Sequence, residues 1–271
     1  MTQPRYQTVG HDSIQYHFFC EGLVFAARVF RTNTLEHHSA WIFEGGQVRE
    51  ILHALTALTQ SPSDHLDIAC PAFGIWADGS QGALRVDAGV RDDRFAVAFT
   101  VRHRYRWVYD AAIAGEDVDH QPDLDCVVTY RGRALRGIGY HKRYFWHRPP
   151  THWGYRFLHG VTDDGSKVVW TADATFGTSK YDYFKVLDRG TGSLLQSDPE
   201  HSAHKQNRIF AFISGERHET IFHEAGAWNV FLRSSAMDSH LQQRSGTFEY
   251  RVGDQTWRGQ ALTESCFGSL G

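Results

Sequence analysis

The sequence predicts an all-β protein made of two β-barrels in tandem. Aromatic residues make up 14% of the 271 residues and 25 residues are glycine, a composition typical of β structure rather than of helical bundles. Short apolar or alternating segments recur between turn signals, which is typical of barrels and sandwiches. A barrel of about eight strands can hold one small ligand. The length accommodates two such barrels, and we expect one at residues 1–122 and the other at residues 123–271.

The first expected element is a hairpin. Residues 13–20 and 23–31 are rich in aromatic and β-branched side chains, and Glu21-Gly22 between them is a turn signal. One segment differs from this pattern, because apolar side chains in residues 47–58 recur at helical spacing. We interpret it as one short amphipathic helix that flanks the first barrel.

Alternation and turn signals predict the other strands. Residues 112–125 lack periodicity, are acidic and contain Pro122, so we expect a solvated loop or domain connector there. The further expected strands, in chain order, are residues 83–90, 94–101, 155–161, 166–171 and 181–187.

A faint internal repeat supports the tandem arrangement. Residues 127–132 lead into Arg136-Gly137, and residues 248–253 lead into Arg258-Gly259. The two Arg-Gly pairs lie 122 residues apart, close to half of the chain. Each copy is a strand, a turn containing glycine and another strand. The repeat predicts two similar β units, each ending with this hairpin.

Charge and apolar content exclude several classes of protein. The 28 basic and 31 acidic residues leave a net charge of −3, so no domain-wide basic footprint for nucleic acid is present. No apolar run reaches about 18 residues, and the N-terminus has no apolar signal region, so we expect neither a membrane span nor secretion. We expect a cytoplasmic protein, monomeric or homodimeric, whose cysteines are free buried thiols: Cys20, Cys70, Cys126 and Cys266.

Residues 136–156 gather side chains suited to a binding or catalytic site. Their glycines allow a close approach of the backbone, and their histidines can exchange a proton near neutral pH. Their aromatic side chains suit an apolar or cationic guest. We interpret this segment as a central hairpin that joins the two barrels.

Part of the same segment resembles a known family. Residues 137–141, Gly-Ile-Gly-Tyr-His, are similar to the G-x-G-Y-H opening of a motif in the carotenoid hydratase (hydroxyneurosporene synthase) and AttH-like family. The family motif continues D-H-N-W-G, whereas residues 142–146 here are Lys-Arg-Tyr-Phe-Trp. Residues 152–154, His-Trp-Gly, resemble the ending of the motif in related members, and residues 258–264 resemble the last hairpin of the family.

This resemblance implies two tandem lipocalin-like antiparallel β-barrels. It also implies an enzyme of the hydratase, cyclase or pericyclase type, acting on terpenoid, polyketide or alkaloid intermediates.

Four side chains are candidates for catalysis. His141 and His152 are candidate general acids or bases, and Tyr183 can donate a proton. Glu264 is a candidate proton source, because a carboxyl group in an apolar barrel keeps its proton more readily. For each residue, packing in the core or exposure on the surface is the alternative. The candidate substrate-binding residues are Tyr140, Arg143, Trp146, Trp153, Tyr155, Arg156, Trp170 and Asp173.

These features predict a cofactor-independent acid/base enzyme, a lyase- or isomerase-type cyclase or hydratase. Its substrate would be a hydrophobic natural-product intermediate held in a barrel pocket. One alternative is a non-catalytic lipocalin-type carrier of a hydrophobic ligand. The other is a metalloenzyme whose ligands come from His141, His147, His152 and His159, although neither an HExxH motif nor a pair of neighbouring cysteines is present and we predict no metal.

Overall fold

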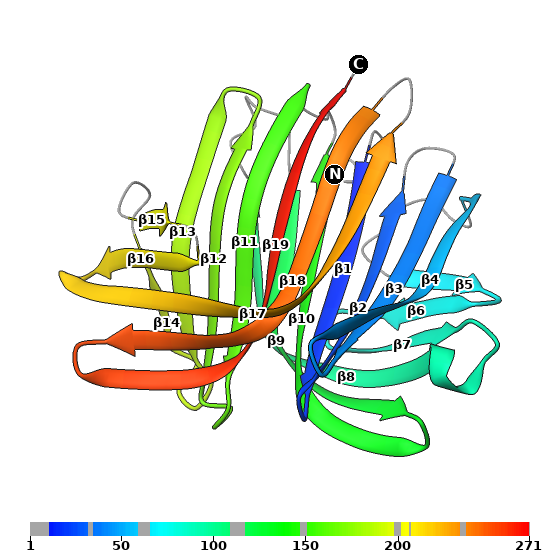
Figure 1. The fold of residues 1–271 in the computed structure, drawn as a ribbon, viewed down its shortest axis with the longest axis horizontal. Coiled ribbons are helices and arrows are strands. Elements are labelled where there is room, and N and C mark those ends of the chain that lie inside the picture. Colours follow the sequence, from blue (N-terminus) through cyan, green and yellow to red (C-terminus); the bar gives the residue numbers. More distant parts are fainter. Residues whose placement is uncertain are drawn as a thin grey trace, which may run out of the picture. The chain divides into compact units, whose positions relative to one another are not determined.

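The computed structural model describes residues 11–31, 35–58, 66–108, 117–146, 151–197, 202–205, 207–233 and 237–270. Almost all of these residues lie in antiparallel strands, which confirms the all-β prediction (Figure 1). The described ranges contain one turn of 3-10 helix, η1 (Arg91–Asp93), and no α-helix. They therefore contain no helix that could cross a membrane.

The first sheet has ten strands in the order β4-β3-β2-β1-β10-β9-β8-β7-β6-β5. Consecutive strands pair with each other except β4 and β5, which lie at the two edges of the sheet. The pairing of β1 with β10 brings the two ends of this part of the chain together. The strands are β1 (His11–Cys20), β2 (Leu23–Arg31), β3 (Leu35–Glu44), β4 (Gln47–Ala57), β5 (Leu66–Cys70), β6 (Phe73–Ala77), β7 (Gln81–Asp87), β8 (Arg94–Val108), β9 (Asp117–Tyr130) and β10 (Arg133–Trp146).

The second sheet has nine strands in the order β14-β13-β12-β11-β19-β18-β17-β16-β15. Its first strand, β11, again pairs with its last, β19. The strands are β11 (His152–Thr162), β12 (Lys167–Phe176), β13 (Ser179–Asp188), β14 (Leu194–Gln196), β15 (Ser202–Lys205), β16 (Arg208–Ile213), β17 (Glu216–Arg233), β18 (Met237–Val252) and β19 (Gln255–Leu270).

Contacts divide the chain into two compact units. The first unit comprises Met1–Glu44 and Arg49–Pro149, and the second comprises Gly45–Val48 and Pro150–Gly271. The expected boundary between residues 122 and 123 lies inside β9, whose partners β8 and β10 belong to the same sheet. The division falls after β10 because β9 and β10 complete the first sheet.

Each unit has its own apolar core on one face of its sheet, here called the core face; the opposite side is called the reverse face. Burying one such aromatic or aliphatic side chain contributes about 1.5–3 kcal/mol. The first core includes Phe18, Phe25, Phe73, Phe95 and Val128, and the second includes Leu158, Val169, Phe184, Phe222 and Phe248.

The internal repeat is present in the structure. Phe19 pairs with Ile138 in the first sheet, and Val161 pairs with Gln260 in the second. Residues 138 and 260 keep the 122-residue spacing that the sequence shows between its two Arg-Gly pairs. Both copies turn through two residues, since Tyr130 pairs with Arg133 and Val252 pairs with Gln255. Positions 122 residues apart are therefore equivalent in β10 and β19, and in β9 and β18 from Leu124 onward.

Glycine at the repeated position permits the first and last strands of each unit to approach closely. A Cβ atom on Gly137 would overlap the carbonyl oxygen of Phe19, and a Cβ atom on Gly259 would overlap that of Val161. The two glycines meet equivalent residues of β1 and β11. Their role in the repeat is therefore steric.

The helix expected at residues 47–58 is wrong, because this segment forms strand β4 beside β3. Gly45 and Gly46 both have positive φ, at 58° and 78°, as a tight hairpin turn requires. This turn returns the chain along β3. The apolar spacing does not create a buried helical stripe, since Ile51 is buried while Leu55 is 66% exposed.

The acidic loop expected at residues 112–125 is wrong from residue 117 onward, where β9 begins; the part before it lies outside the described residues. Its carboxylates are paired with the basic strand β8. Arg104 donates to Asp119, and the His103 Nδ1 atom lies 2.9 Å from the Asp123 carboxylate. Ion pairing with a neighbouring strand thus replaces solvation.

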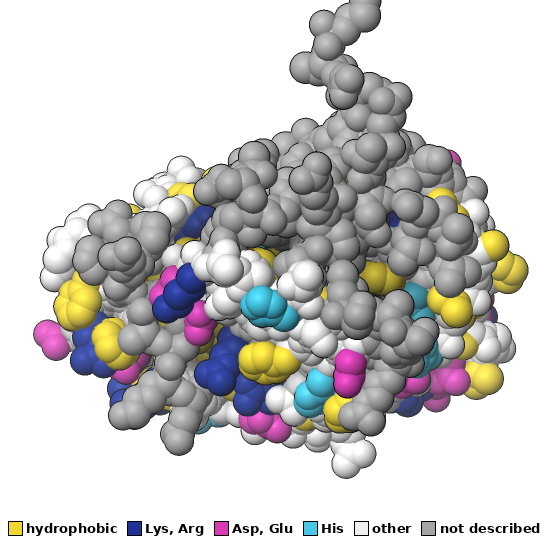
Figure 2. Space-filling model, turned by 90° about the horizontal axis from the view of Figure 1, so that it is seen from above, with side chains coloured by type: hydrophobic (Ala, Val, Ile, Leu, Met, Phe, Trp, Pro, Cys, Tyr) yellow, Lys and Arg dark blue, Asp and Glu magenta, His cyan; other side chains and the backbone are white. Residues whose placement is uncertain are grey.

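Residues 136–156 do not form a central hairpin. β10 pairs with β1 and β9, while β11 pairs with β12 and β19, so the two strands belong to different sheets. The four cysteines are free, and all are buried except Cys70, which is half-buried. On the face shown in Figure 2, acidic and basic side chains of the described residues are interspersed, in keeping with the small net charge.

Gly137→Ala should lower the free energy of unfolding by about 2 kcal/mol or more, because the added methyl group separates β10 from β1. Urea denaturation followed by circular dichroism measures the change. Gly74→Ala, also in a strand of the first unit, is the control, because its Cβ atom would lie 3.5 Å from the Ile68 oxygen, an ordinary contact. Equal stability of the two variants would contradict the steric role of Gly137.

Candidate proton-transfer site

A hydrogen-bonded carboxylate lies on the reverse face of the second sheet. Glu264 on β19 is buried, with 3% of its surface exposed. Its Oε1 atom accepts a hydrogen bond of 2.6 Å from the Tyr155 hydroxyl, and its Oε2 atom accepts one from the Gln243 amide. Both carboxylate oxygens are oriented by donors, an arrangement suited to moving a proton at a defined position.

Strand register explains why these three side chains meet. Glu264 pairs with Gln243 on β18 and with Phe157 on β11. Tyr155 lies two residues before Phe157 and therefore on the same face of β11, one diagonal step from Glu264. The β11–β19 pairing that closes the second sheet thus also assembles the carboxylate with its donors.

Several aromatic side chains lie on the same face of the second sheet as this group. The Trp153 indole donates to the sulfur of Cys266, two residues from Glu264 on β19, at 3.3 Å, and the rings of Tyr155 and Phe176 lie 6.4 Å apart. Trp170 on β12 and Tyr183 on β13 are both buried. This face is therefore rich in aromatic side chains, which suits a hydrophobic guest.

Lys185 adds a cation to the aromatic face. It pairs with Trp170 across β12 and β13, and its Nζ atom lies 4.6 Å from the centre of the Tyr183 ring. Burial lowers the pKa of Lys185 to about 8, since desolvation disfavours its charged form. Its ammonium group therefore loses a proton more easily than an exposed lysine does.

His141 lies in the first unit, on the core face of its sheet. It is buried, its ring stacks on that of Tyr16 at 4.3 Å, and Nδ1 lies 3.2 Å from the Gln15 carbonyl oxygen. Burial lowers the pKa of His141 to about 4; Asp119 raises it and Arg143 lowers it further. With Nδ1 donating to the carbonyl, the neutral ring presents Nε2 as a base.

Arg143 takes part in a buried ion-pair network in the first unit. Both Arg143 and Arg31 donate to the Asp12 carboxylate, with the shortest contact at 2.8 Å. Burial alone would raise the pKa of Asp12, but the two guanidinium groups hold it below its usual range. Arg31 also lies 3.8 Å from Glu36. The charge of Arg143 is thus balanced by Asp12 within the fold.

Tyr140 lies on the face opposite His141, because neighbouring strand residues alternate. It is buried, its ring stacks on His17 at 5.3 Å, and it meets His120 edge-on at 4.9 Å. The neighbouring Lys142 is also buried, with its Nζ atom 4.0 Å from the centre of the Tyr144 ring.

The remaining predicted residues do not join Glu264. His152 and Arg156 are exposed and share the core-face side of β11 with Leu158. Asp173 is the cross-strand partner of Arg156. The backbone of Trp146 ends β10, and its side chain lies outside the described residues, as does His147.

The structure therefore brings five predicted residues to one face of the second sheet: Trp153, Tyr155, Trp170, Tyr183 and Glu264. His141, Arg143 and Tyr140 belong to the first unit, and no three His, Cys, Asp or Glu side chains among the described residues form a group able to hold a metal ion. Sequence reasoning missed Gln243 and Lys185. Lys185 had a signal, because it is a charged residue between the apolar Phe184 and Val186.

Comparison with known proteins defines the fold class. No protein-family model matches the sequence, and no curated protein matches it. Among solved structures, a putative AttH from Nitrosomonas europaea has a TM-score of 0.64 at 12% identity, covering 94% of this chain and 92% of that chain. Kievitone hydratase from Nectria haematococca has a TM-score of 0.59 at 11% identity, and the match covers 97% of this chain and 90% of that chain.

CghA, solved with Sch210972, has a TM-score of 0.58 at 11% identity and covers 95% of this chain and 88% of that chain. These structures are tandem lipocalin-like barrels, so the fold inferred from the sequence resemblance is confirmed. At such low identity the similarity concerns the fold.

Replacing His141 with Asn should reduce the loss of stability on acidification. A buried neutral histidine stabilises the fold fully above its unfolded pKa of about 6.5, and this contribution is lost as pH falls towards its folded pKa of about 4. The decrease in unfolding free energy between pH 7 and pH 4 should shrink by about 3 kcal/mol. Urea denaturation at both pH values measures it.

The exposed His152 provides the matched control, and His152→Asn should leave the decrease unchanged. An unaltered pH dependence in His141→Asn would contradict the burial of a neutral imidazole at position 141.

Proposed function

We propose that this protein is a cofactor-independent acid/base enzyme that hydrates, cyclises or isomerises a hydrophobic small molecule. The observation that carries the proposal is the buried Tyr155–Glu264–Gln243 hydrogen-bonded group on an aromatic face. The substrate class we propose is a terpenoid, polyketide or alkaloid intermediate, since the face that bears Glu264 is rich in aromatic side chains.

Glu264 and Tyr155 supply the proton chemistry. Both Glu264 oxygens accept hydrogen bonds, so the carboxylate is oriented as a base, and Tyr155 is the adjacent donor. In an isomerisation, Glu264 removes a proton from one carbon, releases it to solvent, and delivers a solvent-derived proton to another carbon. In a hydration, the pair delivers a proton to an alkene carbon, water attacks the resulting cation, and Glu264 accepts the proton that water releases.

Two further features stabilise the charge that develops. The ring face of Trp153 attracts positive charge on the substrate carbon. Gln243 holds one oxygen of Glu264 in place, which reduces the reorganisation needed during proton transfer. The name of kievitone hydratase, a structural relative, is consistent with hydration as one of the proposed reactions.

Solvent isotopes test this proposal, because each of the proposed reactions incorporates atoms from water, and only hydration incorporates oxygen. The candidate substrates are prenylated phenols, with kievitone as the first, and polyenes. The protein is incubated with each of them in H₂¹⁸O and, separately, in D₂O. Mass spectrometry detects the products. Hydration adds one ¹⁸O, and proton-driven isomerisation or cyclisation adds one deuterium. Glu264→Gln should lower the rate about 100-fold or more, and Tyr155→Phe roughly tenfold, because general acid–base groups contribute at this scale.

Glu249→Gln is the matched control, since Glu249 lies near the end of β18 and pairs with Arg251. It should retain the wild-type rate. If Glu264→Gln turned over substrate at the wild-type rate, this result would contradict the proposed role of Glu264. Binding of a panel member without isotope incorporation would favour the carrier alternative.

A further inference from the structure

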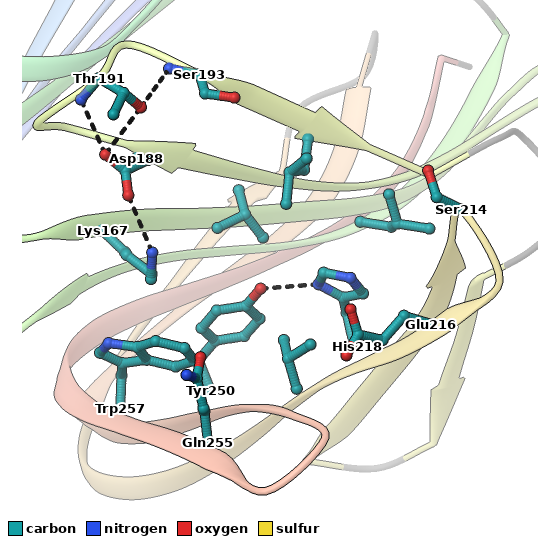
Figure 3. A pocket seen from close by; sticks show the side chains of 14 residues that line it. Lys167, Asp188, Thr191, Ser193, Ser214, Glu216, His218, Tyr250, Gln255 and Trp257 are labelled. Carbon is teal, nitrogen blue, oxygen red and sulfur yellow. Dashed lines mark hydrogen bonds and ion pairs between the residues drawn. The ribbon is translucent and has the colours of Figure 1, made fainter.

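The second unit contains a pocket on its core face, separate from the face that bears Glu264. Its cavity volume is about 400 Å³, within the range of small-molecule sites. Residues from β12, β13, β14, β16, β17, β18 and β19 and from the turns beside them line it (Figure 3). Its ionisable and aromatic members are Lys167, Asp188, Glu216, His218, Tyr250 and Trp257.

A neutral hydrogen-bonded pair lies inside the pocket. The Tyr250 hydroxyl and the His218 Nδ1 atom are 2.8 Å apart, and both residues are buried (Figure 3). Burial raises the pKa of Tyr250 and lowers that of His218, so both groups are neutral. Either group can donate across the 2.8 Å contact, and we assign Tyr250 as the donor, which places the His218 proton on Nε2. Within the described part of the chain, the hydrogen bonding of this ring is confined to Nδ1, which leaves Nε2–H as a donor for a guest.

Aromatic rings and a fixed cation form one side of the pocket. Trp257 stacks on Tyr250 with ring centres 5.3 Å apart. The Lys167 Nζ atom lies 4.9 Å from the centre of the Trp257 ring and 3.2 Å from the Asp188 carboxylate. Hydrogen bonds from Thr191 and from Lys167 hold the pKa of Asp188 at about 2, so it stays ionised and balances the lysine.

The first unit provides an internal comparison. By the repeat spacing, Tyr250 and Trp257 correspond to Val128 and Leu135. His218 pairs with Val252 as Phe95 pairs with Tyr130, so His218 corresponds to Phe95. These three residues of the first unit are buried core side chains.

Lys167 follows the same rule. Val161 and Phe19 are equivalent, and they pair with Val168 and Val24 respectively. The residues just before these partners, Lys167 and Leu23, are therefore equivalent too. Leu23 packs against the first core. At four equivalent positions, the first unit fills its interior with apolar side chains while the second presents hydrogen-bonding and stacking groups around a cavity. The pocket is therefore a property of the second unit rather than of the repeated fold.

We infer that this pocket binds a small, flat, uncharged molecule of one or two aromatic rings that carries a phenol or carbonyl oxygen. The Tyr250–Trp257 stack offers a surface for a planar ring. The His218 Nε2–H group donates to the oxygen of the guest. An anion is disfavoured because two carboxylates, Asp188 and Glu216, oppose the single ammonium group of Lys167, and a cation would have to displace Lys167.

Calorimetric titration with 2-naphthol tests the inference, with naphthalene as the probe without oxygen and 2-naphthoate as the anionic probe. We expect 2-naphthol to bind at least threefold more tightly than either, since one hydrogen bond contributes about 0.5–1.5 kcal/mol. His218→Phe and the double variant His218→Phe/Tyr250→Val introduce the residues of the first unit. The former should weaken binding roughly three- to tenfold, and the latter should abolish it.

These variants should remain folded, because the first unit uses the same residues in its core, and thermal denaturation checks this. His240→Phe is the control, since His240 stacks on Phe231 and does not line the pocket. Unchanged affinity in folded His218→Phe and in the double variant would overturn the inference. The inference would also be overturned if Glu264→Gln were the only variant to lose 2-naphthol binding. That result would place the probe on the reverse face, and it would not contradict the proposed reaction.

Discussion

The pairing of the first strand with the last strand in each unit is the constraint on which the rest of the structure depends. In the second unit, β11 lies against β19, and Gly259 permits the approach. The same pairing sets Glu264 beside Phe157 and one diagonal step from Tyr155. On the opposite side of the sheet, β18 and β19 carry Tyr250 and Trp257 into the pocket. The pairing of β11 with β19 thus positions both the proposed reactive group and the proposed binding site.

The two units use the same framework for different purposes. Glu264 occupies the β19 position that Lys142 occupies in β10, 122 residues earlier, and both side chains are buried. The first unit devotes its buried charges to ion pairs such as Asp12 with Arg31, whose partners compensate each other. Removing one partner of such a pair costs about 3–5 kcal/mol, because the other charge is left buried without compensation. Glu264 instead accepts hydrogen bonds from the neutral groups of Tyr155 and Gln243.

Much of the fold could be predicted from the sequence, because alternation and turn residues are local signals. Glu21-Gly22 marked the first hairpin, and the two Arg-Gly pairs marked the repeat. The helix expected at residues 47–58 was wrong because tertiary pairing with β3 overrode the apolar spacing. The acidic segment was misread because the partners of Asp119 and Asp123 lie on another strand, and pairing of this kind is not visible in local composition.

The site was predicted only in part for the same reason. Tyr155 and Glu264 were identified by their type and by the family resemblance, but their hydrogen bond depends on register between strands more than 100 residues apart in sequence. Gln243 has no local signal at all. His141 was grouped with these residues because it is near them in sequence, whereas strand order places it in the first unit.

The most direct test of the account is a double-mutant cycle on turnover with Tyr155→Phe, Glu264→Gln and the double variant. If Tyr155 acts through Glu264, the double variant should be no slower than Glu264→Gln alone, because effects within one catalytic unit are not additive. Independent, multiplicative losses in the double variant would contradict a shared role for the two side chains.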